Sequence, residues 1–234
     1  MNALSLTDAF THARAWTQSR LTRKGPRAYA DTHDVAVSLL GGAPPCRALD
    51  LAAGRGELSQ KLVDLGHDVT AVERYTPQFE ADVPLVDADL NQRWPFEDGS
   101  FDAATAVEIL EHVENPRFFL RELARVLKPR GVAIVSTPNL TTLVSRAIFA
   151  VCGQWDLFFN HPWRLRDPYS SDVEGHITPL PAWLLRHHAK DAGFVVEASS
   201  YSRAWLPGVP WRLNPLPSGK AFGRILIVRL RKCD

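Results

Sequence analysis

The chain has 234 residues, of which 45% are hydrophobic and 23% charged, a composition that predicts one globular domain. Its formal net charge of +1 argues against nucleic acid as a partner, because no overall positive field attracts a polyanion, although a local basic patch stays open. No basic stretch followed by an apolar run opens the sequence, so we expect no signal peptide. The longest apolar run, 140–152, contains Arg146 and is shorter than the roughly 18 residues that a membrane span needs.

Three cysteines, Cys46, Cys152 and Cys233, lie far apart in the sequence. Their odd number and their spacing predict neither a disulfide framework nor a cysteine metal site. Without a signal peptide, this cysteine usage predicts a cytoplasmic protein. The sequence carries no signal for the oligomeric state.

Two helices are predicted before the first strand. Apolar residues recur at helical spacing over Leu4–Trp16 and again over Tyr29–Leu40, where Gly41 and Gly42 end the second helix. The basic stretch 20–27 separates the two. Helices in this position either cover a bound ligand or cover only the edge of a sheet, and the sequence leaves both roles open.

Strands and helices then alternate, which predicts a parallel sheet with helices on both faces. Pro95 and Gly99 mark a turn before the fourth strand, and Pro129-Arg130-Gly131 ends a helix before the fifth. The predicted elements are strand 46–51, helix 57–65, strand 68–73, strand 83–86, strand 102–107, helix 116–127 and strand 131–137.

Beyond Pro138 the pattern becomes irregular. The aromatic content of this part argues against disorder, and a long irregular segment in a compact domain is usually functional. The predicted segments are helix 140–152, irregular 153–179, helix 181–192, strand 194–200, irregular 203–223 and strand 225–230.

The stretch ALDLAAGRGELS, 48–59, is typical of a nucleotide-binding turn. A short apolar strand ends at Leu51, small residues occupy most of Ala52–Gly56, and a helical pattern begins at Glu57. Small residues let backbone N–H groups approach an anionic ligand at the positive end of a helix. Glu73 ends the next apolar run and can accept both hydroxyls of a ribose. We therefore expect the ligand to be a nucleoside with an anionic group.

Dinucleotides and S-adenosylmethionine both fit that description. The dinucleotide fingerprint G-x-G-x-x-G is incomplete, because Ser59 occupies the third glycine position after Gly54 and Gly56, and the sequence contains no such run. A nicotinamide-dependent dehydrogenase is therefore disfavoured. S-adenosylmethionine offers a carboxylate and an amino group in place of a pyrophosphate.

Three strings in this order resemble the class I S-adenosylmethionine-dependent methyltransferases of the methyltransferase 11 type: LDLAAGRG, WPFEDGSFDAATAVEILEHVENP and ELARVLKPRGVAIVSTPN. The resemblance covers 47–139 closely and extends more weakly through 176–194 and the last strand. It implies a Rossmann-like α/β fold with a mostly parallel seven-stranded sheet and helices on both faces. Ala52 departs from the usual glycine of the family and narrows the space beside the cofactor.

The resemblance also implies a cofactor site. Asp50 and the backbone of Ala52–Gly56 would surround the methionine part, Glu73 would bind the ribose hydroxyls, and Val107 and Glu108 would lie beneath the sulfonium.

The adenine would meet a second group of residues. Arg74 would lie along the ring, although a solvated surface charge is the alternative. Asp89 would receive the amino group, with Asp87 as its competitor, and the Leu90 N–H would meet a ring nitrogen. The predicted cofactor-binding residues are thus Asp50, Ala52, Gly54, Gly56, Glu73, Arg74, Asp89, Leu90 and Glu108.

The string from Glu108 through Glu111 to His112 resembles one that binds a divalent cation in small-RNA 2′-O-methyltransferases and in some ubiquinone-pathway O-methyltransferases. In the RNA enzymes a later histidine, His176 here, completes the site. Carboxylates with imidazole suit magnesium, manganese or zinc, and such an ion would lower the pKa of a substrate hydroxyl. The alternative is that no metal binds and His112 only packs or forms a hydrogen bond locally. Without metal, His112 or His176 could still act as the catalytic general base. His161 is a weaker candidate.

The acceptor pocket is expected from the aromatic and basic side chains of the 153–179 segment, which suit a planar or anionic acceptor or form only the core of a lid. These residues are Trp155, Phe158, Phe159, Trp163, Arg164, Arg166 and Tyr169. We interpret 1–234 as one domain with leading helices 1–42, a cofactor-binding core 46–137, a substrate lid 138–180 and a C-terminal part 181–234.

The predicted function is methyl transfer from S-adenosylmethionine to an oxygen, or a nitrogen, of a small or glycan-like acceptor. Two alternatives stay open: a metal-dependent RNA 2′-O-methyltransferase, and a non-catalytic partner protein that only binds S-adenosylmethionine.

Overall fold

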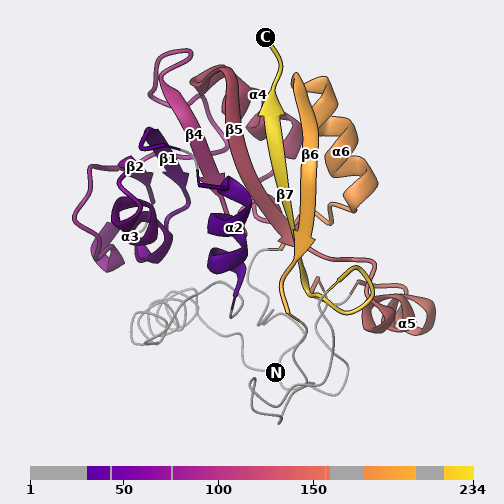
Figure 1. Ribbon diagram of the computed structural model, residues 1–234. Helices are drawn as coiled ribbons and strands as arrows, with labels where there is room; N and C mark the ends of the chain where they lie inside the picture. Colours follow the sequence, from indigo (N-terminus) through magenta and orange to yellow (C-terminus); the bar gives the residue numbers. More distant parts are fainter. Residues whose placement is uncertain (1–30, 43, 75, 156, 159–175, 204–218) are drawn as a thin grey trace, which may run out of the picture.

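The computed structural model describes residues 31–42, 44–74, 76–155, 157–158, 176–203 and 219–234 (Figure 1). One seven-stranded sheet forms its centre, in the order β3-β2-β1-β4-β5-β7-β6. The strands are β1 (Arg47–Leu51), β2 (Asp68–Val72), β3 (Leu85–Val86), β4 (Phe101–Ala106), β5 (Leu127–Pro138), β6 (Phe194–Tyr201) and β7 (Ile225–Lys232).

The described helices are α2 (Thr32–Leu40), α3 (Glu57–Asp64), α4 (Pro116–Val126), α5 (Leu143–Cys152) and α6 (Ala182–Asp191), with a 3₁₀ turn at Thr76–Gln78. None of the helices in the described part of the chain is long and apolar enough to cross a membrane. The helix predicted over Leu4–Trp16 lies outside the described residues, as do His161 and the rest of 159–175 in the predicted lid.

Strand direction confirms the predicted α/β architecture. The pairs β1–β2, β1–β4, β2–β3 and β4–β5 are parallel, whereas β7 runs antiparallel to both β5 and β6. The carboxyl ends of β1, β2 and β4 therefore meet at one edge of the sheet, which is where ligands bind in folds of this kind.

Helix boundaries follow from local capping chemistry. The Asn115 side chain accepts a hydrogen bond of 3.0 Å from the Phe118 N–H, and Pro116 occupies the first turn of α4, where a missing N–H costs nothing. Gly41 ends α2 in the left-handed conformation, as its place after the apolar pattern predicted.

Strand β5 begins earlier than the predicted residue 131. It follows α4 directly at Leu127, and the Pro129-Arg130-Gly131 turn lies inside it as an irregularity. The register shifts between Phe101 and Ala103 of β4, and Arg130 takes a φ of +63°. The turn residues thus make a bulge within the strand, because the chain on both sides of them still pairs with β4.

Two apolar clusters pack on opposite faces of the sheet. Leu49 and Leu51 of β1 belong to the cluster that includes α4 and α6, whereas Ala48 belongs to the one that includes α2 and α3. Side chains alternate between the faces of a strand, so Asp50 points to the face covered by α3.

The carboxylate of Asp50 ties three elements together inside this packing. Its side chain is 1% exposed, and it accepts hydrogen bonds from the hydroxyls of Ser59 on α3 at 2.6 Å and Thr105 on β4 at 2.7 Å. Burial raises the pKa of Asp50 to about 6, while the two hydroxyl donors act in the opposite direction. A buried acid with two hydroxyl donors therefore connects β1, β4 and the first turn of α3.

The raised pKa of Asp50 makes stability depend on pH. The pKa of about 6 in the folded protein exceeds the roughly 3.9 of an unfolded chain, so the folded protein holds this proton more tightly. Ionisation of Asp50 therefore lowers the free energy of unfolding as pH rises from about 4 to above 6. We expect the free energy of unfolding of Asp50→Asn, relative to wild type, to rise by about 2–3 kcal/mol between about pH 4 and pH 7 in urea denaturation. A difference that does not change with pH would contradict this, and Asp68→Asn at the exposed start of β2 is the control.

Two glycines of the β1–α3 loop give a matched test of close packing. Gly54 and Gly56 both have positive φ, +60° and +89°, so alanine at either costs about 1–2 kcal/mol. A Cβ at Gly56 would lie 2.6 Å from the Ala81 Cβ, whereas one at Gly54 would meet no described atom within 4 Å. We expect Gly56→Ala to lose about 1–3 kcal/mol more stability than Gly54→Ala in thermal unfolding. Equal losses would show that the contact with Ala81 relaxes freely.

Candidate active site

The loop after β1 is bound to the end of β2. The Ala53 N–H donates to the Val72 carbonyl at 3.0 Å, and the Gly54 N–H donates to Glu73 Oε2 at 2.7 Å. Ala52 takes a φ of +56°, so the alanine that departs from the usual glycine adopts a backbone conformation that glycine tolerates better. The predicted loop and the predicted ribose-binding carboxylate of Glu73 are therefore brought together.

Asp89 lies beyond β3 at the same edge of the sheet. It accepts hydrogen bonds from the Asn91 N–H at 3.0 Å and from Arg74 Nη1 at 3.0 Å. The Asn91 hydrogen bond is the main cause of its lowered pKa, to which Arg74 adds. The Arg74 side chain is thus largely exposed and also paired with Asp89. Leu90, which follows Asp89 in the sequence, is buried.

Glu108 lies just beyond β4, after Val107, in a strained backbone conformation. Its φ is +54°, which is uncommon for a residue with a side chain, and its N–H donates to the Ser136 hydroxyl of β5 at 2.8 Å. Its charge contributes to the raised pKa of Glu111. Such strain persists only where surrounding contacts hold it, and it is frequent at functional sites.

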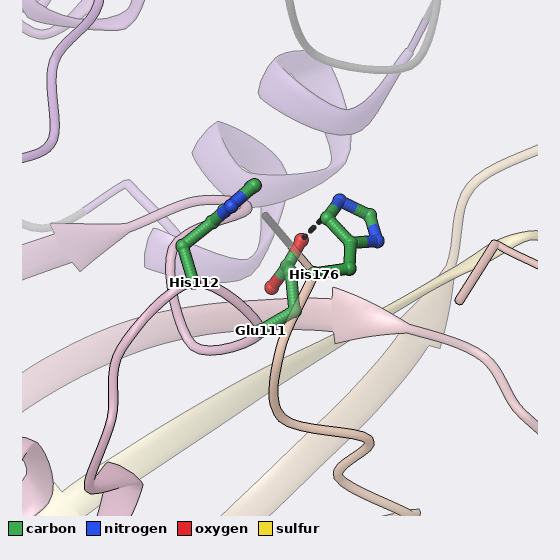
Figure 2. Close-up of side chains that lie close together, drawn as sticks. All are labelled: Glu111, His112 and His176. Atoms are coloured by element: carbon green, nitrogen blue, oxygen red, sulfur yellow. Dashed lines mark ion pairs between the residues drawn. The ribbon is translucent and has the colours of Figure 1, made fainter. Parts of the chain in front are cut away.

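Three of the four predicted metal-site residues form a cluster (Figure 2). Glu111, His112 and His176 each offer a ligand atom, and these atoms all lie within 4.8 Å of one another. Glu108 is not part of this cluster. Glu111 is fully buried, and neither of its carboxylate oxygens has a hydrogen-bond partner among the described residues. A buried carboxylate without partners is costly, and burial raises the pKa of Glu111 well above its ordinary value.

His176 presents its Nε2 to this carboxylate. Its Nδ1 lies 2.8 Å from the Leu157 carbonyl, and because a carbonyl only accepts, Nδ1 carries the proton. Nε2 lies 3.9 Å from Glu111 Oε1, the pair that Figure 2 marks with a dashed line. Burial, with a smaller effect of the His112 charge, lowers the pKa of His176 to about 4. The imidazole is therefore neutral at pH 7, with a lone pair on Nε2.

Backbone hydrogen bonds hold the distant His176 segment in place. The N–H groups of Ile177 and Thr178 donate to the Glu111 carbonyl at 2.9 Å and 3.1 Å, and the Thr178 hydroxyl donates to the Val113 carbonyl at 2.8 Å. The rings of His112 and His176 meet edge-on, with centroids 4.7 Å apart.

Two of the predicted lid aromatics lie among the described residues. Phe158 packs 5.3 Å from the His176 ring, and Trp155 stacks on Phe149 of α5 with centroids 4.1 Å apart. The other predicted lid residues lie outside the described part: Phe159, Trp163, Arg164, Arg166 and Tyr169.

Sequence reasoning missed the residues that support the site. Ser59, Thr105 and Ser136 donate to or accept from site residues through their hydroxyls, and the Leu157 carbonyl sets the tautomer of His176. Only Ser59 carried a local signal, since it occupies the third glycine position of the dinucleotide fingerprint. The others are distant in sequence from the residues that they support.

Part of the chain is similar in sequence to known methyltransferases. The family model of the methyltransferase domain matches residues 49–135. The mitochondrial ubiquinone biosynthesis O-methyltransferase of Schizosaccharomyces pombe is 37% identical over 108 residues, which cover 42% of this chain and 39% of that protein. The chain thus spans about two fifths of the length of that relative.

Two solved structures have the same fold. An S-adenosylmethionine-dependent methyltransferase of Thermotoga maritima matches with a TM-score of 0.62 and 20% identity over 96% of each chain. The 1,6-didemethyltoxoflavin-N1-methyltransferase of Burkholderia thailandensis, solved with 1,6-didemethyltoxoflavin and S-adenosylhomocysteine, matches with a TM-score of 0.61 and 18% identity over 100% of this chain and 93% of that chain. The chain therefore has the fold of the class I S-adenosylmethionine-dependent methyltransferases, and its residues 49–135 match their methyltransferase domain.

Proposed function

We propose that the chain transfers a methyl group from S-adenosylmethionine to an oxygen of a small-molecule acceptor. The observation that carries this proposal is the glycine loop after β1 with the Glu73 carboxylate 2.7 Å from the Gly54 N–H. Oxygen rather than nitrogen is supported by the ubiquinone biosynthesis O-methyltransferase to which the chain is similar. A nitrogen acceptor stays the second choice, since the Burkholderia neighbour is an N1-methyltransferase.

The residues at this edge of the sheet fit the cofactor. A Cβ at Gly54 would meet no described atom within 4 Å, so the backbone there is open to a ligand, and the Glu73 carboxylate suits two ribose hydroxyls. Asp50 holds the loop in place through its hydrogen bonds with Ser59 and Thr105. The proposed contacts to the adenine and the sulfonium come from Arg74, Asp89, Leu90 and Glu108.

Bound S-adenosylmethionine supplies a methyl group on a positively charged sulfur. A lone pair of the acceptor oxygen forms the new C–O bond as the S–CH₃ bond breaks, which leaves S-adenosylhomocysteine and a proton to be removed from the acceptor. The Nε2 lone pair of His176 suits that proton, because Nδ1–H is engaged with Leu157. The methyl group is already activated, so the positioning of the two reactants supplies most of the rate.

The cluster of Glu111, His112 and His176 also fits a divalent cation. Both Glu111 oxygens are buried without partners among the described residues, and His176 directs a neutral nitrogen at them while its other nitrogen donates to a carbonyl. That second hydrogen bond is the usual support of a metal-binding histidine. A cation held by these residues would lower the pKa of the acceptor hydroxyl. The Nε2 lone pair of His176 can bind the cation or accept the proton of the acceptor, but not both at once. Metal titration distinguishes these two roles.

The same cluster would suit the 2′-hydroxyl of an RNA. We prefer the small-molecule acceptor because the net charge of +1 provides no overall attraction for a polyanion.

A cytoplasmic location is part of the proposal, supported by the three cysteines, Cys46, Cys152 and Cys233, all of which are free.

Replacement of Glu73 tests the cofactor site. We expect Glu73→Ala to weaken S-adenosylmethionine binding about 10–100-fold in calorimetry, because hydrogen bonds to a charged group are each worth about 1.5–3 kcal/mol. Asp68→Ala, at the opposite end of the same strand, is the control and should bind as wild type does. Unchanged affinity in a folded Glu73→Ala variant would refute this placement of the ribose.

Replacement of Glu111 tests the metal site. We expect manganese or zinc to raise the unfolding temperature of the wild type, because a cation that binds only the folded state stabilises it. Glu111→Gln should lose this response, whereas Glu114→Gln, three residues on and exposed, should keep it. A wild type that neither binds nor responds to these metals would contradict the metal site and leave His176 as the proton acceptor.

A further inference from the structure

Helix α5 exposes apolar side chains over most of its surface. Of its ten residues, LVSRAIFAVC, only Ser145 is buried. Leu143 is 53% exposed, Val144 56%, Phe149 41% and Val151 86%. These four are half of the large exposed hydrophobic residues in the described part of the chain, gathered in one short helix. A concentration of this kind marks an interaction surface, because scattered exposed residues are the normal case.

The helix is firmly attached at its amino end. The Leu143 N–H donates to the Ala221 carbonyl at 2.9 Å, and the Thr142 hydroxyl accepts from the Ser145 N–H at 3.0 Å. The Asn139 side chain donates to the carbonyls of Lys220 at 2.9 Å and Gly223 at 2.7 Å. The helix is thus a fixed projection beyond the end of β5, set off from the sheet in Figure 1.

Two exposed cations lie in the described segments that form and hold α5. Segments 139–155 and 219–224 contain no acidic residue, and they carry the exposed cations Arg146 and Lys220. An apolar face bordered by cations complements an anionic lipid surface.

We propose that α5 docks on the surface of an anionic lipid bilayer. Ten residues make a helix of about 15 Å, half of the roughly 30 Å hydrocarbon core, so α5 would lie in the interface and not across it. The stacked Phe149 and Trp155 suit that depth, since aromatic rings favour the boundary between headgroups and chains. A second copy fits less well, because the footprint of one such helix, about 150 Å², is far below the roughly 800 Å² per partner of a stable interface.

Docking would place the candidate active site beside the membrane. The chain runs from α5 through Trp155 to Phe158, which packs on His176, and Ile177 next to His176 is itself 57% exposed. If the proposed methyl transfer is correct, on which this consequence rests, the acceptor would be an amphiphile that enters from the lipid. Membrane docking itself needs no acceptor and is measured separately.

The test is sedimentation of the full chain with vesicles of equal parts phosphatidylglycerol and phosphatidylcholine, compared with phosphatidylcholine alone. We expect wild type to bind the anionic vesicles and Val144→Asp to lower the partition coefficient at least about tenfold. Arg146→Glu should lose the preference for anionic vesicles. Val195→Asp is the matched control, because Val195 is 55% exposed but pairs across β7 with the start of β5, the opposite end from α5.

Three outcomes would overturn the docking proposal. The first is that wild type stays in solution with both kinds of vesicle. The second is that Val195→Asp weakens vesicle binding as much as Val144→Asp does. The third is that light scattering shows a wild-type dimer that Val144→Asp dissociates. Circular dichroism of each variant shows whether the fold is kept. Calorimetry with S-adenosylmethionine tests the proposed function independently, so a chain that binds the cofactor but not the vesicles would refute only the docking.

Discussion

The hydrogen bonds to the buried carboxylate of Asp50 are the interaction on which the site depends. Ser59 and Thr105 bring α3 and β4 to the same side chain of β1. The loop between β1 and α3 consequently starts and ends at fixed points, and the Gly54 N–H reaches Glu73 at the end of β2. Asp50 thus fixes the backbone of the loop that we propose as part of the cofactor site. The cost is a carboxylate in an apolar interior, which appears as a raised pKa.

Two chemically different surfaces adjoin at the carboxyl edge of the sheet. The carboxyl groups of Glu73 and Glu108 suit a sulfonium there, and the buried carboxyl group of Glu111 suits a divalent cation. The neighbouring α5 is apolar and bordered by cations. This separation would let one face hold a positively charged reactant while the adjacent one meets a negatively charged membrane.

Most of the fold could be predicted because its signals are local. The strand at β1, the small-residue turn and the Gly41 stop are each read within a few residues. The bulge in β5 could not be predicted, because the sequence Pro129-Arg130-Gly131 is equally typical of a turn that ends a helix. Only the continued pairing with β4 on both sides of the bulge makes it part of a strand.

By itself, the sequence determined the α/β alternation, the small-residue turn and Glu73 that we propose to bind a nucleoside, and the candidate string from Glu108 to His112. Tertiary structure decided which of these groups meet. It brought His176 to Glu111, left Glu108 outside their cluster, and placed the Asp50 carboxylate between the hydroxyls of Ser59 and Thr105. The physical reason is that periodicity and turn chemistry depend on neighbours along the chain, whereas the partners of a buried carboxylate come from elements far apart in sequence.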